Sequence, residues 1–364
     1  MYEKHGLPSI QALRAIAAIA VAVAHACHYL EKELGIPNPL PGSEFGSAGV
    51  DLFFVISGFV MVYASERFFR REARPAEFFL RRLARIVPLY WVTTSIILAY
   101  LLLHYGSLQA VHFSPAVVIA SYLFIPYPQT DGYMAPIHGV GWSLNFEMFF
   151  YVCFCLALPL GRRLGVAVLT ALLVGLVAIN RTLPPPLDYL AEPIVLEFAM
   201  GMLIALAVRE GYRLPVIVCA ALVSTGVVGF VLSYWHTDID HMVAWGIPSA
   251  LVVAGVTLAK APLKSGPLAR GVSFLGDASY SLYLVHPIAV TLPRRLLGPY
   301  LNGAAAPLLH AALLLAVAIA AACMVHVVFE RPVTRYLHDR IAAGFSRRSA
   351  APGRTAQPAP SSPP

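Results

Sequence analysis

A succession of apolar stretches, each about 20 residues long, is the feature of this sequence that most restricts its fold. A helix of that length matches the hydrocarbon core of a bilayer. Ten such stretches follow one another, at residues 10–30, 48–66, 87–105, 142–160, 164–180, 188–208, 214–234, 242–259, 272–292 and 305–328. Only 12% of the residues are charged, about half the share of a soluble domain. The pattern predicts an all-α, polytopic membrane helix bundle of about ten transmembrane helices.

A further apolar segment, residues 114–126, is shorter and is bracketed by Pro115, Pro126 and Pro128. We expect a short re-entrant or interfacial segment there. Basic residues support this assignment, because Lys and Arg concentrate in the cytoplasmic loops of membrane proteins. With ten crossings and a cytoplasmic N-terminus, 21 of the 26 Lys and Arg residues are cytoplasmic, four are outside, and Arg14 lies within the first span. Both termini are therefore predicted to be cytoplasmic.

The formal net charge of +7 does not indicate nucleic acid, because the basic residues lie in loops that face membrane lipids. The five cysteines lie in apolar stretches without metal-ligand spacing, so we expect buried free thiols and no metal. The N-terminus resembles a cleavable signal peptide, but its apolar run continues to Leu30, which favours an uncleaved span. Residues 1–340 form one predicted membrane domain, and 341–364 a predicted disordered cytoplasmic tail.

Ionisable side chains within apolar spans are costly, so each is a candidate functional residue. Arg14 and His25 are eleven residues apart in the first span, on one helical face and about 16 Å apart along the axis. Asp51, Glu147 and His286 are predicted to lie at the depth of His25, in the outer half of the membrane. Structural alternatives exist: Arg14 can reach the interface, His25 can bond another helix, and Asp51 can cap its own. The shared depth favours function, with a carboxylate orienting a histidine that acts as general base.

The densest group of charges is the sequence ERFFRREARPAEFFLRRLARIVP at residues 66–88. Its first four arginines are typical of a cytoplasmic anchor on anionic lipid headgroups. Arg82 and Arg85 differ, because they are three residues apart at the start of the third span and share one helix face. Such a pair suits bidentate phosphate binding.

Six motifs follow one another along the chain: QALRAIAA at 11–18 with His25, GVDLFFVISGF at 49–59, RRLARIVPLYW at 81–91, WSLNFEMFFY at 142–151, SYSLYLVHP at 279–287 and FERPVTR at 329–335. In this order they resemble the acyltransferase 3 family of integral membrane acyltransferases, over roughly residues 7–340. The first two motifs are most similar to the bacterial exopolysaccharide-production members of that family.

The resemblance implies transfer of an acyl group, commonly acetyl, from cytosolic acyl-coenzyme A to a hydroxyl of an exopolysaccharide or other cell-surface glycan. The reaction would take place in the bacterial inner membrane, with acyl-CoA as a substrate and no permanently bound cofactor. The family's essential Arg and His fall on Arg14 and His25, its Arg-x-x-Arg pair on Arg82 and Arg85, and its carboxylate on Glu147. The three arginines are accordingly expected to bind the donor.

For catalysis we expect His25 as the general base, with Glu147 or Asp51 orienting its ring, and Glu147 is favoured by the resemblance. His286 is expected on the acceptor side. Whether the acyl group rests on the protein during transfer stays open, with Ser57 and His25 as the candidate carriers.

The residues alone leave a second class of function open, a secondary transporter or flippase for a glycan or lipid-linked precursor. Transporters are often built from repeats that are visible in the two halves of the chain. No second copy of the Arg14–His25 or GVDLFFVISGF pattern follows residue 180. The sequence therefore favours the enzyme.

Overall fold

The computed structural model describes residues 7–36, 38–40, 42–106, 114–129, 134–235, 239–260, 266–297 and 307–349. Within these ranges the chain is helical and forms no β-strand, which confirms the predicted all-α fold. The longer helices are α1 (Pro8–Leu34), α2 (Gly49–Ala64), α4 (Pro75–Tyr105), α6 (Trp142–Ala157), α7 (Arg162–Ala178), α9 (Leu196–Arg209), α10 (Val216–Trp235), α11 (Ile247–Thr257), α12 (Pro267–Asp277), α13 (Ser279–Leu297), α14 (Pro307–Val325) and α15 (Arg331–Ser349).

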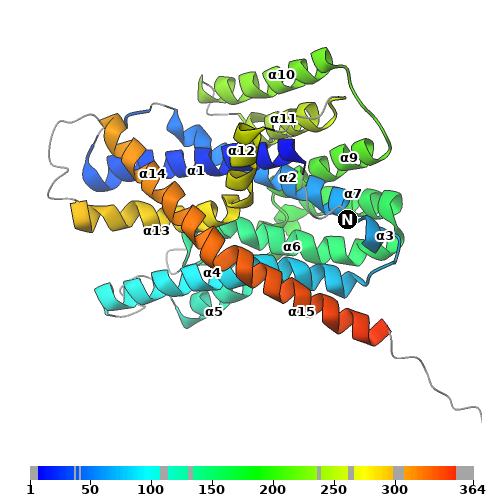
Figure 1. Ribbon diagram of the computed structural model, residues 1–364, viewed down its shortest axis with the longest axis horizontal. Helices are drawn as coiled ribbons and strands as arrows, with labels where there is room; N and C mark the ends of the chain where they lie inside the picture. Colours follow the sequence, from blue (N-terminus) through cyan, green and yellow to red (C-terminus); the bar gives the residue numbers. More distant parts are fainter. Residues whose placement is uncertain are drawn as a thin grey trace, which may run out of the picture.

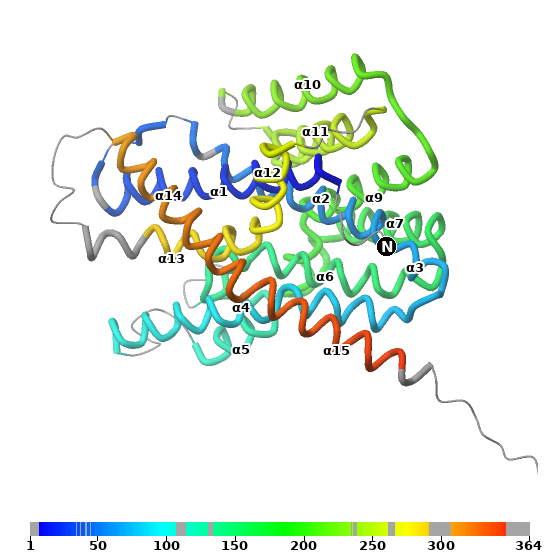
Figure 2. Tube along the Cα trace, in the orientation of Figure 1, coloured from blue at the N-terminus to red at the C-terminus, as the bar shows by residue number. Residues whose placement is uncertain are grey.

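Shorter elements connect these helices. They are α3 (Glu66–Phe69), α5 (Pro115–Leu123) and α8 (Leu187–Leu190), the 3-10 turns η2 (Ser43–Ala48), η4 (Gly139–Gly141), η5 (Leu158–Leu160), η6 (Asn180–Thr182) and η7 (Pro193–Val195), and the π-helical turns η8 (Met242–Gly246) and η10 (His326–Glu330). Figure 1 shows α14 continuing into α15 as one long helix across the bundle. The helices α10 and α11 lie on one side of the bundle, and α4 and α5 lie on the other (Figure 2).

Six helices of the described chain are long and apolar enough to cross a membrane: Pro8–Glu33, Phe45–Ala64, Pro75–Tyr105, Gly139–Leu160, Val216–Ser233 and Pro307–Ser346. The remaining predicted spans also contain helices, but shorter ones, such as the 17 residues of α7 and the 14 residues of α9. The chain is a multi-pass membrane protein, and its five cysteines are free thiols. The number of complete crossings stays a prediction.

Two spans that the sequence predicted as single helices, 188–208 and 272–292, are interrupted. The second is divided between α12 and α13, and the division has a packing reason. A Cβ atom on Gly276 would lie 2.2 Å from the carbonyl oxygen of Gln11, so the end of α12 packs directly against the backbone of α1. The Gln11 amide also donates a hydrogen bond to Asp277, at 2.6 Å. The break therefore fastens α12 to the first helix.

The third span differs from its prediction at its start. The helix α4 begins at Pro75, twelve residues before the predicted boundary, because a proline suits the first helical turn and the charged residues that follow lowered the local hydropathy. Arg82 and Arg85 consequently lie about 10 and 15 Å along the helix axis from its first residue. They lie within α4 and not before it, and their place at the cytoplasmic mouth stays a prediction.

Two further segments bear on the predictions. The nine residues of α5 cover about 14 Å, less than half of a hydrocarbon core of about 30 Å, which agrees with the short segment predicted at 114–126. At the other end of the chain, α15 continues to Ser349 and packs against α4, where the His338 Nε2 bonds the Arg81 carbonyl at 3.0 Å. Residues 341–349 of the predicted disordered tail are thus helical, and 350–364 lie outside the described residues.

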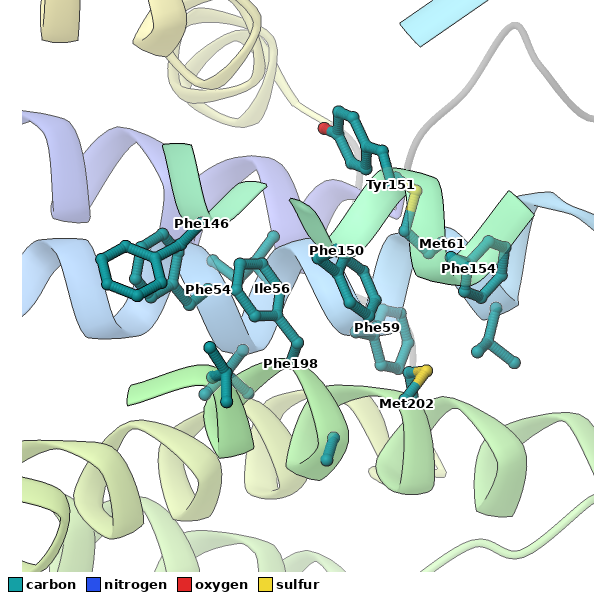
Figure 3. Close-up of a cluster of buried hydrophobic side chains, with 14 of the residues drawn as sticks. Phe54, Ile56, Phe59, Met61, Phe146, Phe150, Tyr151, Phe154, Phe198 and Met202 are labelled. Atoms are coloured by element: carbon teal, nitrogen blue, oxygen red, sulfur yellow. The ribbon is translucent and has the colours of Figure 1, made fainter. Parts of the chain in front are cut away.

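The core lies between α2, α6 and α9 (Figure 3). The rings of Phe150 and Phe198 stack there, with centroids 4.3 Å apart. Glycine allows α2 and α9 to approach closely. A Cβ atom on Gly58 of α2 would lie 2.1 Å from the carbonyl oxygen of Phe198, and one on Gly201 of α9 would lie 2.0 Å from that of Val55. Small residues are the usual means of close helix packing in membranes. This helix pair holds the α2 side chains of the site in place.

Candidate functional site

A cavity between α1, α2, α4, α6 and α13 brings the three arginines of the predicted donor site together. Arg14, Arg82 and Arg85 line it, together with Glu147, and its empty volume including the opening is about 740 Å³. Hydroxyl groups supply much of the remaining polar wall, from Ser57, Ser143, Tyr151, Ser279, Tyr280 and Tyr283. Three guanidinium groups face one carboxylate, so the cavity carries a net positive charge and suits an anionic ligand.

Glu147 is held within this cavity by two hydroxyl groups. Ser57 donates a hydrogen bond to the Glu147 Oε1 at 3.1 Å, and Tyr151 donates to the same oxygen. Tyr151 follows Glu147 by one helical turn and points away from the aromatic cluster of Phe150 and Phe198 (Figure 3). The carboxylate also acts electrostatically on Arg14. The structure places Glu147 among the arginines, and no hydrogen bond of the described residues joins it to His25.

His25 lies farther along α1, and its ring is oriented by its own helix. The Nδ1 atom is 3.0 Å from the carbonyl oxygen of Val21, one turn earlier. Because a carbonyl only accepts, Nδ1 carries the proton of the neutral ring and Nε2 keeps a free lone pair. The Val21 carbonyl thus does what the sequence assigned to Glu147 or Asp51, and it leaves a basic nitrogen at Nε2.

His286 of α13 meets His25, as their shared depth suggested. The two ring centroids are 4.8 Å apart in an edge-to-face arrangement. His286 is fully buried, its Nδ1 donates to the Leu282 carbonyl at 2.9 Å, and its Nε2 has no hydrogen-bond partner in the described part of the chain. Tyr283 lines the cavity with its ring 6.2 Å from that of His286. Tyr283 therefore links the wall of the cavity to the histidine pair.

Asp51 belongs to a different cluster. Its Oδ1 accepts a hydrogen bond of 2.6 Å from the Nε2 of His241, and Glu197 lies beside both. The bond to Asp51 raises the pKa of His241, which lies just outside the apolar segment 242–257. Asp51, the sequence's alternative to Glu147 for orienting the His25 ring, is thus bonded to a different histidine. The sequence offered no signal for this cluster, since Asp51 and His241 are 190 residues apart.

Several polar residues of the site were missed, because the sequence analysis selected only charged or ionisable side chains within the apolar spans. Tyr151, Tyr280 and Tyr283 lie within the WSLNFEMFFY and SYSLYLVHP motifs, which was their only sequence signal. Glu330, in the FERPVTR motif, is buried and accepts hydrogen bonds from Ser281 at 2.6 Å and from the Nδ1 of His326 at 2.8 Å. Glu330 also acts electrostatically on Arg14, so it helps to balance the positive charge of the cavity.

Comparison with known proteins gives one family and several relatives. Residues 7–327 match a family described as an acyltransferase domain. The chain is 34% identical to the exopolysaccharide production protein ExoZ of Rhizobium meliloti, over 84% of this chain and 95% of that protein. It is 30% identical to the acyltransferase MdmB of Streptomyces mycarofaciens, over 92% and 93%. The peptidoglycan O-acetyltransferase OatA of Listeria monocytogenes is 26% identical over 42% of this chain and 24% of its own length. No solved structure matches the chain.

Proposed function

The chain belongs to the acyltransferase 3 family, as its six motifs predicted, and we propose that it transfers an acyl group from cytosolic acyl-coenzyme A to a hydroxyl of a polysaccharide. It is a membrane enzyme that transfers acyl groups other than aminoacyl groups. The relatives named for exopolysaccharide production and for peptidoglycan O-acetylation support a glycan acceptor, with exopolysaccharide first and acetyl as the expected acyl group.

The observation that carries this proposal is the cavity with three guanidinium groups. Coenzyme A bears a diphosphate and a separate phosphate, and a planar guanidinium binds such groups through paired hydrogen bonds. Arg82 and Arg85 come from one face of α4, and Arg14 comes from α1. In the predicted orientation, with both termini cytoplasmic, these arginines lie toward the cytosol and His25 lies about 16 Å farther along α1. The donor phosphates and the reacting thioester thus occupy different heights.

The chemistry assigned to His25 follows from its free Nε2. A sugar hydroxyl is a weak nucleophile until a base accepts its proton. We assign that step to His25 Nε2, while the hydroxyl oxygen attacks the carbonyl carbon of the thioester. The C–S bond then breaks, the imidazolium returns the proton to the leaving thiolate, and the products are the glycan ester and free coenzyme A. His286 packs against the ring of this base, and Tyr283 lines the cavity next to His286.

The test is a transfer assay with purified protein, acetyl-CoA labelled in the acetyl group, and a glycan extracted from the producing bacterium. We expect label in the glycan only when the protein is present, and mild alkali should release it as an ester would. A reaction without glycan and a reaction with His25→Gln serve as controls. Label that never reaches the glycan, although the protein binds acetyl-CoA, would refute glycan acylation, and a protein that also fails to bind acetyl-CoA would refute the donor.

A further inference from the structure

Three side chains of ligand type meet where α2, α9 and the segment before α11 come together. Asp51 lies in the first turn of α2 and Glu197 in the first turn of α9, while His241 directly precedes the π-helical turn η8. The carboxylate oxygens and the imidazole nitrogen all lie within 4.8 Å of one another. The helices α2, α9 and α11 pack against one another, so this convergence belongs to the fold.

Glu197 is the unusual member of this group. Its side chain is fully buried, and neither carboxylate oxygen accepts a hydrogen bond from an N–H or hydroxyl donor among the residues that the structure describes; the polar group beside it is the Asp51 carboxylate. In that part of the chain no Lys or Arg forms an ion pair with Glu197 or Asp51. A buried carboxylate without a partner is costly, and the positive end of a helix offsets only a small part of that cost. Among the described residues, Glu197 therefore has no Lys or Arg to balance its charge, and the basic group beside it is the His241 imidazole.

The surroundings of the cluster favour a cation. Besides Asp51, the charged groups that act electrostatically on His241 are Asp240 and Glu192, both negative. The backbone of Gly246 packs directly against Glu197, since a Cβ atom there would lie 3.0 Å from the Glu197 Oε1, and this contact fixes the carboxylate beside Asp51 and His241. His241 is 46% exposed, which provides an entry path and allows its ring to move.

We propose that Asp51, Glu197 and His241 bind a divalent transition-metal ion of the Zn²⁺ type. Two carboxylate oxygens and one imidazole nitrogen give three protein ligands, and water completes a tetrahedral site. Imidazole favours Zn²⁺ over Mg²⁺ or Ca²⁺, which prefer oxygen ligands alone. The 2.6 Å between Asp51 and His241 is a hydrogen-bond distance, so the exposed His241 ring moves outward when the ion enters. The ion ties together the ends of α2, α9 and α11, and this role is independent of acyl transfer.

The test measures metal content and thermal stability on the full-length protein without an affinity tag, after removal of metals with EDTA. On addition of Zn²⁺ and gel filtration, the wild type should retain about one ion per chain. Its melting temperature should rise with the Zn²⁺ concentration, as expected for a ligand of the folded state. The same concentration of Mg²⁺ should have little effect. A wild type that retains no Zn²⁺ and shows no rise in melting temperature would overturn the proposal.

Variants locate the site. Glu197→Gln keeps the size of the side chain and removes its charge, and should weaken Zn²⁺ binding by about 100-fold or more, since even the loss of an outer partner of a metal ligand costs about 10–100-fold. Glu192→Gln makes the same charge change nearby without removing a ligand, and should weaken Zn²⁺ binding only a fewfold. If Glu197→Gln does not fold, His241→Ala decides, because its half-exposed side chain is removed without opening a core cavity. Wild-type Zn²⁺ affinity in Glu197→Gln or His241→Ala would refute the assignment.

Discussion

The double variant Arg82→Gln/Arg85→Gln tests the donor cavity. Both guanidinium groups line the cavity with Arg14, and the Arg82 guanidinium also lies 5.2 Å from the centroid of the Phe78 ring. Gln keeps a polar side chain of moderate length and removes the charge and the planar fork. The helix α4 should persist, because Gln is a good helix former. The change therefore removes two anion contacts with little effect on the fold.

The expected loss follows from the number of contacts. A hydrogen bond to a charged group contributes about 1.5–3 kcal/mol, so two contribute about 3–6 kcal/mol. Because 1.4 kcal/mol corresponds to a tenfold change in affinity, the Kd for acetyl-CoA should rise by about 10²–10⁴-fold. Lys at both positions should restore only part of the affinity, because an ammonium group lacks the fork.

The assay is isothermal titration of the purified proteins with acetyl-CoA in detergent. The matched control is Arg70→Gln/Arg74→Gln, which removes the same two charges from exposed positions of the same basic segment. This control should bind acetyl-CoA within a fewfold of the wild type. An unchanged Kd in Arg82→Gln/Arg85→Gln would refute the donor site, and an equal loss in both double variants would mean that only net charge matters.

Three further outcomes are expected. In a cysteine-free background, Glu31→Cys should react with an impermeant thiol reagent on intact spheroplasts and Arg74→Cys only after lysis; the reverse pattern would invert the predicted orientation. Gly201→Ala should lower thermal stability in detergent by about 1–3 kcal/mol, because its Cβ would lie 2.0 Å from a carbonyl oxygen, whereas Gly175→Ala, with no atom within 4 Å, should not. Glu147→Gln should slow acyl transfer less than loss of the general base does, as measured in the labelled-acetyl assay, and a complete loss would assign Glu147 a direct role in the chemistry.

The helices were largely predictable because apolar runs of membrane length determine them. The start of α4 was not, because the charged residues between Pro75 and Arg85 face a bundle that the sequence does not show. The interruption at Ala278 depends on the contact of Gly276 with the α1 backbone, which hydropathy cannot reveal. Apolar runs therefore predict where the helices lie, whereas close contacts between backbones determine where a helix ends.

The sequence indicated which residues belong to the candidate site better than it indicated which of them contact one another. His25 and His286, which the sequence placed at a similar depth, are neighbours in the structure. Depth does not give the direction in which a side chain points around its helix. Glu147 therefore faces the arginine cavity, and Asp51 faces His241, although the sequence placed both at the depth of His25 and expected one of them to orient its ring. The Val21 carbonyl that orients His25 is a backbone group, which no pattern of side chains can indicate.

The measurement that tests the central claim most directly compares acyl transfer with donor binding in His25→Gln. Gln retains hydrogen-bonding groups but cannot accept the proton of the acceptor hydroxyl. Because His25 is not among the residues that line the arginine cavity, the Kd for acetyl-CoA should stay close to that of the wild type. The rate of transfer to glycan should fall by about 10²–10⁴-fold. Transfer at a near-normal rate would contradict the role of His25 as the base, and loss of acetyl-CoA binding would place His25 in the donor site instead.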